Sequence, residues 1–467
     1  MGRLVLGGTG TGVGKTTAAL ALMAALRRRG LDVRPFKVGP DFIDPGYHRL
    51  ACSRPSRNLD GWMLPREAVV DLVRGAGDGF AVIEGVMGLF DGVDGRSEAG
   101  STAALAKWLQ APVLLVVDVG GLARSAAAVV QGFESFDPGL RLGGLLFNRV
   151  GGAGHYRMLQ EALAGHVTAR PLGYLPWDRA LTIPERHLGL VTAEERGLSP
   201  DLLERLANAL ERHADVDAII ALGESAGPLA DSQGRPRAAS MGKPIHRVRV
   251  AVARDAAFCF YYEENLELLQ ARGADLVPFS PLTDPVLPAG VHGVYLGGGY
   301  PEVHAAALAA NGSLLEELRT RAADGLPVYA ECGGFMYCTE GIEDEQGVFH
   351  PMVGLFPTRA SMREPRLTLG YVEVEVTAEN ILGGAGLRAR GHVFHASRTA
   401  PMPATVRRTY RLRRAGGPEM QEEGYAWQQV LGSYAHLHFL SNPTVADGFV
   451  RACRRHAGML PVSGGTP

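Results

Sequence analysis

Apolar and polar positions follow two patterns along the first half of the chain. Short, continuously apolar runs indicate buried strands, and segments with apolar residues three or four positions apart predict helices between them. The predicted strands span residues 3–7, 32–37, 80–92, 111–119, 142–148 and 171–176, and the predicted helices span 16–30, 102–110 and 125–133. Strands this apolar, separated by helices, indicate a parallel sheet covered on both faces. We therefore predict an α/β domain over residues 1–222.

This pattern breaks at residues 223–245, which are rich in glycine, serine, alanine and proline and have no periodicity. Such a composition is typical of a linker. A new apolar strand begins at residue 247, so a second α/β domain is predicted over residues 246–456, followed by a disordered tail at 457–467. A chain of 467 residues is too long for a single hydrophobic core, which agrees with this division.

A glycine-rich segment, GGTGTGVGKTT (residues 7–17), lies between the first predicted strand and the first predicted helix. In that context glycines let backbone N–H groups converge on phosphate oxygens at the positive end of a helix. Lys15 would reach the β- and γ-phosphates, and the Thr16 hydroxyl would bind Mg²⁺. A glycine-rich turn is the simpler alternative, but the flanking strand and the GKTT ending favour a nucleoside triphosphate site. The predicted ATP-binding residues of this loop are Thr11, Gly12, Gly14, Lys15, Thr16 and Thr17.

Polar side chains also follow the other predicted strands at their carboxyl ends, where parallel sheets bind ligands. They are Lys37, Asp41, Asp44, Glu84, Asp91 and Asn148. Taken singly, each acid is better explained as a turn residue or a helix cap. Together, beside a phosphate loop, they predict a magnesium-dependent site for ATP chemistry. Two roles fit Asn148 at this position: hydrogen bonding to the edge of the adenine, or formation of a turn.

The second domain places Cys332 directly after an apolar strand and before a helical stretch, in VYAECGGFMYCTEG. This strand–turn–helix arrangement exposes a nucleophile and frees helix N–H groups for an oxyanion, and a helix N-terminus lowers a thiol pKa. GSYAHLHF offers His436 as the base and His438 two residues later. Alone, the cysteine would be a buried thiol and the histidine a core residue. The glycines predicted to support the oxyanion are Gly298 and Gly299, from VYLGGGYPE, and Gly333.

Composition excludes several classes of function. The net charge of −2 provides no bulk basic surface for nucleic acid. The longest apolar run, residues 111–117, is too short to cross a bilayer, and the phosphate loop leaves no room for a secretory signal before it. Five cysteines are few and odd in number, which favours a reducing compartment. The sequence therefore predicts a cytoplasmic protein.

A set of motifs runs along the chain in the order GVGKTT, KVGPDFIDPGYH, IEGVMGLFDG, PERHLGL, LGGGYPE, ECGGFMY and SYAHLHFLSNP. In this order, and over nearly the whole length, the chain resembles the cobyrinic acid a,c-diamide synthase family, the two-domain glutamine amidotransferases of corrin biosynthesis. A phosphate loop or a Cys–His pair alone would be a weak sign. KVGPDFIDPGYH followed by a Cys-Gly-Gly turn is a specific combination.

The resemblance implies an N-terminal P-loop domain similar to dethiobiotin synthetase and a C-terminal class I glutaminase that lacks the usual triad glutamate. It implies that Cys332 attacks glutamine, that His436 raises its nucleophilicity, and that His438 stands in the glutamate's place. Ammonia would pass inside the protein to the first domain. There ATP would phosphorylate an acetate of the macrocycle, and ammonia would displace the phosphate.

The same resemblance assigns the first domain's polar residues. Asp41 and Glu84 would bind Mg²⁺ together with Thr16 of the phosphate loop, Asp44 and Asp91 would serve phosphoryl transfer and the substrate, and Lys37 would contact ATP. Asn148 is expected to contact ATP from its place at a strand end, and not from the resemblance. The implied partners are ATP, L-glutamine and cobyrinic or hydrogenobyrinic acid, and a homodimer is compatible with the resemblance. Neither nucleic acid nor a membrane is implied.

The chain departs from the family pattern at one place. Where the family has Gly-His-Glu-Phe-His followed by Tyr-Ser, this sequence has Val393 in place of the glutamate and Ala396 in place of the tyrosine. The departure bears on contacts at the domain junction or with the macrocycle, and therefore on substrate identity.

Several alternatives stay open at this point. Nickel sirohydrochlorin carries similar rim acetates, and cobyric acid synthase is a relative that amidates four other side chains. A regulatory P-loop ATPase with an inactive glutaminase-like domain would carry a lysine where Gly10 stands. A ligase using free ammonia would not need Cys332.

Overall fold

The computed structural model describes residues 1–183, 185–186, 189–190, 198–229, 247–417 and 420–460. The chain divides into two compact units, Met1–Gly234 and Arg235–Pro467, and the division falls within the predicted linker. Most of that linker, the end of the predicted tail and much of the PERHLGL motif lie outside the described residues. The first two linker residues, 223 and 224, belong to helix α9, which ends at Glu224.

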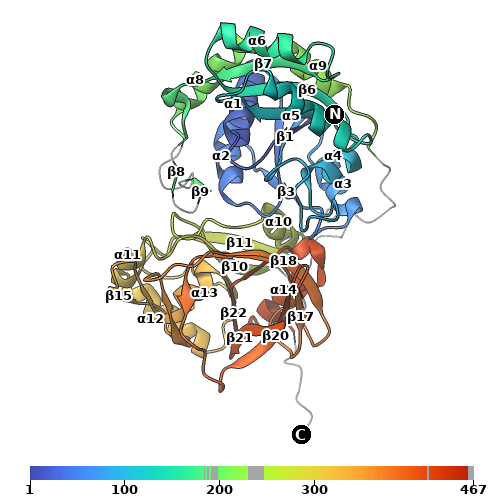
Figure 1. Ribbon diagram of the computed structural model, residues 1–467. Helices are drawn as coiled ribbons and strands as arrows, with labels where there is room; N and C mark the ends of the chain where they lie inside the picture. The colour runs from blue at the N-terminus through green and yellow to red at the C-terminus, as the bar shows by residue number, and fades with distance from the viewer. Residues whose placement is uncertain (184, 187–188, 191–197, 230–246, 418–419, 461–467) are drawn as a thin grey trace. The chain divides into compact units, whose positions relative to one another are not determined.

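The first unit, coloured blue to green in Figure 1, is built on a seven-stranded sheet. Its strand order is β3-β2-β4-β1-β5-β6-β7, and all its strand pairs are parallel. Its strands are β1 (Gly2–Gly8), β2 (Val33–Val38), β3 (Arg57–Leu59), β4 (Phe80–Glu84), β5 (Val113–Asp118), β6 (Leu142–Val150) and β7 (Arg170–Pro176). The order reverses at β1, with β4 on one side and β5 on the other. Open parallel sheets bind ligands at the carboxyl ends of strands beside such a reversal.

Helices connect these strands and cover the sheet. They are α1 (Lys15–Arg28), α2 (Ile43–Cys52), α3 (Arg66–Gly75), α4 (Thr102–Trp108), α5 (Ser125–Phe136), α6 (Ala153–Leu163), α8 (Pro200–His213) and α9 (Val216–Glu224). One core joins α1, α2, α8 and α9 to alternate strand residues such as Leu4 and Leu6. The intervening residue Val5 is also fully buried, so both faces of the sheet are covered, as the apolar strands predict.

One predicted strand is too long. The prediction of a strand over 80–92 is wrong beyond Glu84, where β4 ends. The residues that follow are apolar because loop residues such as Leu89 are buried, and not because they pair with a neighbouring strand. A short antiparallel pair, β8 (Glu185–Arg186) and β9 (Gly189–Leu190), follows the 3-10 turn Arg179–Leu181.

The second unit contains a ten-stranded mixed sheet in the order β11-β10-β12-β13-β22-β21-β20-β17-β18-β23. The strands from β11 to β22 pair in parallel, and the pairs from β22 to β23 are antiparallel. The strands are β10 (Val248–Ala253), β11 (Ala274–Phe279), β12 (Gly293–Leu296), β13 (Val328–Glu331), β17 (Thr368–Val376), β18 (Arg388–His395), β20 (Arg407–Arg414), β21 (Met420–Trp427), β22 (Val430–Ser433) and β23 (Ala435–Leu437).

A smaller sheet and several helices complete this unit. The sheet has the order β15-β14-β16-β19, with β14 (Thr339–Glu343), β15 (Phe349–Pro351), β16 (Phe356–Ser361) and β19 (Arg398–Thr399). The helices are α10 (Glu263–Ala271), α11 (Ala305–Ala310), α12 (Gly312–Ala323), α13 (Gly333–Cys338) and α14 (Thr444–His456), and a 3-10 turn spans Phe439–Ser441. Within the described ranges, no helix combines the length and apolar character needed to span a bilayer.

Candidate functional site

The glycine-rich loop links β1 to α1 in the first unit. Gly12 and Gly14 have φ angles of 76° and 94°, a backbone conformation that glycine adopts without strain. The Asn148 amide donates a hydrogen bond to the Val13 carbonyl at 2.9 Å, and it lies where a side chain on Gly14 would collide. Asn148 therefore holds the loop in shape, in addition to lining the pocket beside it.

A pocket of about 460 Å³ opens at this loop. Most of the predicted nucleotide residues line it, namely Thr11, Gly12, Gly14, Lys15, Thr16, Thr17, Lys37, Asp41, Asp44, Glu84 and Asn148. The pocket is large enough for part of a nucleotide, since sites for small ligands begin near 300 Å³. Sequence reasoning missed two other lining residues, Arg149 and Trp177, whose guanidinium and ring lie 5.6 Å apart.

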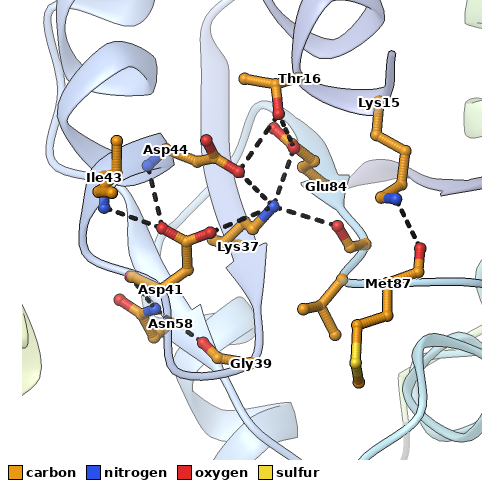
Figure 2. Close-up of polar contacts among 12 residues, drawn as sticks. Lys15, Thr16, Lys37, Gly39, Asp41, Ile43, Asp44, Asn58, Glu84 and Met87 are labelled. Carbon is orange, nitrogen blue, oxygen red and sulfur yellow. Dashed lines mark hydrogen bonds and ion pairs between the residues drawn. The ribbon is translucent and has the colours of Figure 1, made fainter. Parts of the chain in front are cut away.

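The Lys15 ammonium lies in this pocket and donates to the Gly10 carbonyl at 2.8 Å. It also donates to the Met87 carbonyl at 2.5 Å (Figure 2). Burial, with a smaller contribution from the nearby Lys37 charge, lowers the pKa of Lys15 to about 8. Phosphate oxygens would favour the charged form of this group.

Lys37 is the centre of an ion-pair cluster beside the loop. Its ammonium contacts the carboxylates of Asp44, Glu84 and Asp41, the last two at 2.9 and 3.7 Å (Figure 2). The Thr16 hydroxyl donates to Glu84 at 2.7 Å and lies 3.3 Å from Asp44. The positions predicted separately from strand ends therefore converge on one point.

The cluster changes the acidity of its members. Burial alone would lower the pKa of Lys37, but the carboxylates of Asp44, Glu84 and Asp41 raise it well above its usual value. Burial also raises the pKa of Asp44, and its acidic neighbours add to this effect. For Glu84 burial acts in the same direction, but Lys37 and His48 reverse it and hold the pKa far below the usual range. Glu84 is thus ionised and Lys37 charged.

The donor set of this cluster fits Mg²⁺. Within the described part of the chain, no group of three or more histidine, cysteine or acidic side chains has the arrangement of a metal site. Magnesium in phosphoryl-transfer sites needs fewer protein ligands, because waters and phosphate oxygens supply the rest. Thr16, Glu84 and Asp44 bring hard oxygen atoms together in the pocket, with Asp41 beside them.

His48 is a member of this cluster that sequence reasoning missed. It is fully buried, and its Nε2 lies 2.7 Å from Glu84 while its Nδ1 lies 3.0 Å from the Ser56 hydroxyl. An ionised carboxylate only accepts hydrogen bonds, so Nε2 donates to Glu84. His48 closes the KVGPDFIDPGYH motif, and that position was the signal available in the sequence.

Asp91 does not join the cluster. It is absent from the residues that line the pocket, and its carboxylate accepts a hydrogen bond from the Gly88 backbone at 2.8 Å. This contact closes the turn after β4, which is the common role of an aspartate in a loop.

The second unit places Cys332 between β13 and α13 with φ 49° and ψ −103°. A non-glycine residue in this region is strained, and such strain is typical of a nucleophile held on a tight turn. The Cys332 backbone N–H donates to the Ser433 carbonyl at 2.7 Å, and its thiol lies 3.5 Å from the Phe394 carbonyl. The turn is thereby tied to β22 and to β18.

The three predicted glycines pack closely around this turn. A side chain on Gly333 would lie 3.1 Å from the Gly299 nitrogen, so these two glycines are adjacent. Gly299 has φ 155° and leaves no space for a side chain beside Ala257. The Gly298 N–H, predicted to support the oxyanion, donates to the Phe260 carbonyl in this structure. A side chain on Gly298 would lie 2.4 Å from Cε1 of His436, so this glycine makes room for the imidazole.

His436 lies on β23, directly opposite His392 on β18. The two rings stack with centroids 4.9 Å apart, and the Tyr262 hydroxyl lies 2.9 Å from Nδ1 of His392. The His438 ring packs on Tyr262 at 4.5 Å. The two predicted histidines therefore belong to a buried cluster of three, and His392 is the member that was not predicted.

The Cys332 thiol and the His436 imidazole are neutral in this environment. Burial raises the pKa of Cys332, with a further contribution from the Glu302 charge, although the Gly333 N–H opposes it. The prediction of a lowered thiol pKa is wrong, because burial outweighs the opposing effect of the Gly333 N–H at the start of α13. Burial also lowers the pKa of His436 to about 3. A neutral imidazole is able to accept the thiol proton.

Known proteins match both units. Residues 4–191 match the CobQ/CobB/MinD/ParA nucleotide binding domain, and residues 249–444 match the CobB/CobQ-like glutamine amidotransferase domain. The cobyrinate a,c-diamide synthase of Syntrophotalea carbinolica is 44% identical over 97% of this chain and 98% of its own. Those of Leptospira interrogans (strain Fiocruz L1-130) and Salmonella typhimurium are 43% and 41% identical over the same shares.

The chain belongs to the cobyrinate a,c-diamide synthase family. The predictions of a P-loop domain followed by a glutaminase domain, and of a glutamine-hydrolysing ligase, are thereby confirmed. The alternative of a regulatory ATPase with an inactive second domain loses its support, because the similarity to named synthases extends across both units.

The two departures from the family pattern are buried in the second unit. Val393 is 5% and Ala396 6% exposed, and Val393 lines a pocket of about 430 Å³ together with His395, Ser397 and Tyr434. Val393 therefore lies close to the Cys332 turn, because the next residue on the same strand, Phe394, contacts the thiol.

Proposed function

We propose that this protein uses ATP and glutamine to convert the a- and c-acetate carboxylates of cobyrinic acid, or of hydrogenobyrinic acid, into amides. The observation that carries the proposal is the similarity, over 97% of the chain, to relatives named cobyrinate a,c-diamide synthase. The two sites provide the two half-reactions that such a synthesis needs.

In the second unit, Cys332 attacks the side-chain amide carbon of glutamine and its proton passes to His436. The oxyanion is stabilised by backbone N–H groups at Gly299 and Gly333. His436 then donates the proton to the departing nitrogen, which leaves as ammonia, and water hydrolyses the thioester to glutamate. A neutral thiol and a neutral imidazole are the correct starting forms for this transfer.

In the first unit, a rim carboxylate attacks the γ-phosphate of ATP and releases ADP. This step is needed because a carboxylate is a poor electrophile, whereas an acyl phosphate carries a good leaving group. Lys15 and Lys37 stabilise the negative charge on the transferring phosphoryl group. We expected Asp41 as the third magnesium ligand, but Asp44 is the carboxylate beside the Thr16 hydroxyl. Thr16, Glu84 and Asp44 would therefore hold Mg²⁺, which neutralises phosphate charge when bound. Ammonia then attacks the acyl carbon and displaces phosphate.

The substrate is tested by incubating the protein with ATP, Mg²⁺, glutamine and, in parallel, cobyrinic acid, hydrogenobyrinic acid or nickel sirohydrochlorin. Mass spectrometry of each macrocycle should find two successive amidations of cobyrinic or hydrogenobyrinic acid. Amidation of nickel sirohydrochlorin alone would replace the proposed substrate and keep the chemistry. Amidation of none of the three would contradict the proposal.

A further inference from the structure

A buried glutamate directly precedes Cys332. Glu331 ends β13 and is 2% exposed. Its Oε1 accepts hydrogen bonds from the Tyr329 hydroxyl at 2.5 Å and from the Leu437 backbone N–H at 3.0 Å, and its Oε2 accepts from the Tyr295 hydroxyl at 2.8 Å. Burying a carboxylate costs free energy that donors of this kind must offset. The steps proposed above make no use of it.

The strand order shows why the hydrogen bond between Glu331 and the Leu437 backbone matters. The nucleophile follows β13 and the base lies on β23, but five strands separate these two in the sheet, namely β22, β21, β20, β17 and β18. Among the described strands, no ladder of backbone hydrogen bonds therefore sets β23 against β13. The chain instead leaves β22 at Ser433, which pairs with Glu331, and four residues later Leu437 returns to the carboxylate of Glu331.

Leu437 stands between His436 and His438, and both polar groups of its backbone are held by buried side chains. Its N–H donates to Glu331, and its carbonyl accepts from the Asn265 amide at 2.7 Å. Glu331 lies on β13 and Asn265 on α10, so two separate elements hold this single residue. A shift at Leu437 would move the neighbouring imidazole.

We infer that Glu331 is a positioning residue of the glutaminase, which holds His436 in register with Cys332 through the backbone of Leu437. The inference rests on the proposed roles of Cys332 and His436. What the contact requires is a hydrogen-bond acceptor at one point in space. For this role, the length of the side chain and its acceptor oxygen matter more than the negative charge at residue 331.

Three substitutions of Glu331 distinguish the effect of side-chain length and acceptor oxygen from the effect of negative charge. Glu331→Gln keeps the length and one acceptor oxygen, so glutamine-dependent amidation should stay within about threefold of the wild type. Glu331→Asp keeps the charge but shortens the side chain, and Glu331→Met keeps the length but removes the acceptor. Both should lower kcat for glutamine by about 100-fold, the scale of an ångström-sized misplacement of a catalytic group. Amidation driven by ammonium should stay unchanged in all three.

Tyr295→Phe provides the matched control, because it removes another donor to the same carboxylate without touching Leu437. It should keep wild-type use of glutamine even where it lowers Tm. Hydrogen-exchange mass spectrometry supplies a readout independent of activity. Peptides containing residues 434–438 should exchange faster in the Asp and Met variants than in the Gln variant.

The inference is overturned if Glu331→Met keeps wild-type glutamine use, or if Glu331→Gln loses as much as Glu331→Met. If the Met variant does not fold, as a loss of its ammonium-driven activity would reveal, the comparison of Asp with Gln decides. Cys332→Ser, assayed beside them, separates this inference from the proposed function. Retained glutamine use in that variant would defeat the proposed function itself, whatever the Glu331 variants do.

Discussion

Lys37 and Glu84 face each other across neighbouring strands, with the ammonium 2.9 Å from the carboxylate. They are register partners on the paired strands β2 and β4, so the backbone ladder itself fixes their approach. Both side chains are buried, at 3% and 0% exposure. A charged lysine is thus built rigidly into the acidic end of the nucleotide pocket.

Replacing Lys37 by methionine should abolish this arrangement. Amidation should fall at least 100-fold, because the cation is lost and three carboxylates are left facing one another. Breaking a buried ion pair should also cost about 3–5 kcal/mol of stability. The measurements are the rate of ATP-dependent amidation and denaturant unfolding of the first unit.

Lys107→Met is the control for that substitution. Lys107 also contacts two carboxylates, those of Glu98 and Asp137, but its side chain is 26% exposed and lies outside the pocket lining. Its loss should cost about 1 kcal/mol or less and leave activity intact. Equal losses in the two variants would contradict the special role of Lys37.

His48 should matter through Glu84. Because its Nε2 holds one carboxylate oxygen, His48→Gln should weaken Mg²⁺ binding in the presence of ATP by about 10- to 100-fold, as removal of such supporting groups does. Titration with Mn²⁺ followed by electron paramagnetic resonance measures this directly. His155, whose ring nitrogens hydrogen-bond to the backbone of Gly151 and Leu122, is the control. If His48→Gln binds the ion as tightly as His155→Gln, the role assigned to His48 is wrong.

The contact between Gly298 and His436 predicts a selective loss. An added methyl group would lie 2.4 Å from the imidazole, so Gly298→Ala should displace the base and reduce glutamine use by about 100-fold. Gly384→Ala adds the same methyl group where it would meet nothing within 4 Å. Steady-state rates with glutamine and with ammonium measure the effect. Glutamine use equal to that of Gly384→Ala would show that the imidazole is not held there.

The buried histidines predict a loss of stability in acid. Burial lowers the pKa of both His436 and His438 to about 3. Below about pH 6.5 the unfolded chain therefore binds protons that the folded chain does not, so stability falls as the pH drops from about 6.5 towards 3. At pH 5 each histidine should cost about 2 kcal/mol relative to pH 7.

Pulse proteolysis in denaturant, with fragments of the second unit identified by mass spectrometry, measures this dependence. In the His438→Gln variant, the loss of stability between pH 7 and pH 5 should be smaller by the contribution of one histidine. A variant with the same change between pH 7 and pH 5 as the wild type would contradict the assignment.

Local sequence signals identified much of the first site. Lys15 and Thr16 belong to a phosphate loop whose spacing is itself the signal. Lys37 and Glu84 end apolar strands, and the carboxyl ends of parallel strands meet at one edge of a sheet. His48 could not be placed in the same way, because it sits inside a helix and only the packing of α2 against the sheet brings it to Glu84.

The second site shows the same limit more clearly. The turn at Cys332 has a local signature, but Glu331 and His392 act through strands far away along the chain. Their partners follow from the strand order of a ten-stranded sheet, which no local pattern in the sequence determines. The pKa of the Cys332 thiol was mispredicted for a related reason. The sequence pattern shows where the helix starts, but it does not show how deeply the turn is buried.

The central claim is that nitrogen is released at Cys332 and used at the phosphate loop. The most direct test is mass spectrometry of the macrocycle after incubation of Cys332→Ser with ATP and Mg²⁺, once with glutamine and once with ammonium. We predict no amidation with glutamine and two amidations with ammonium. Two amidations with glutamine, at the wild-type rate, would contradict the account.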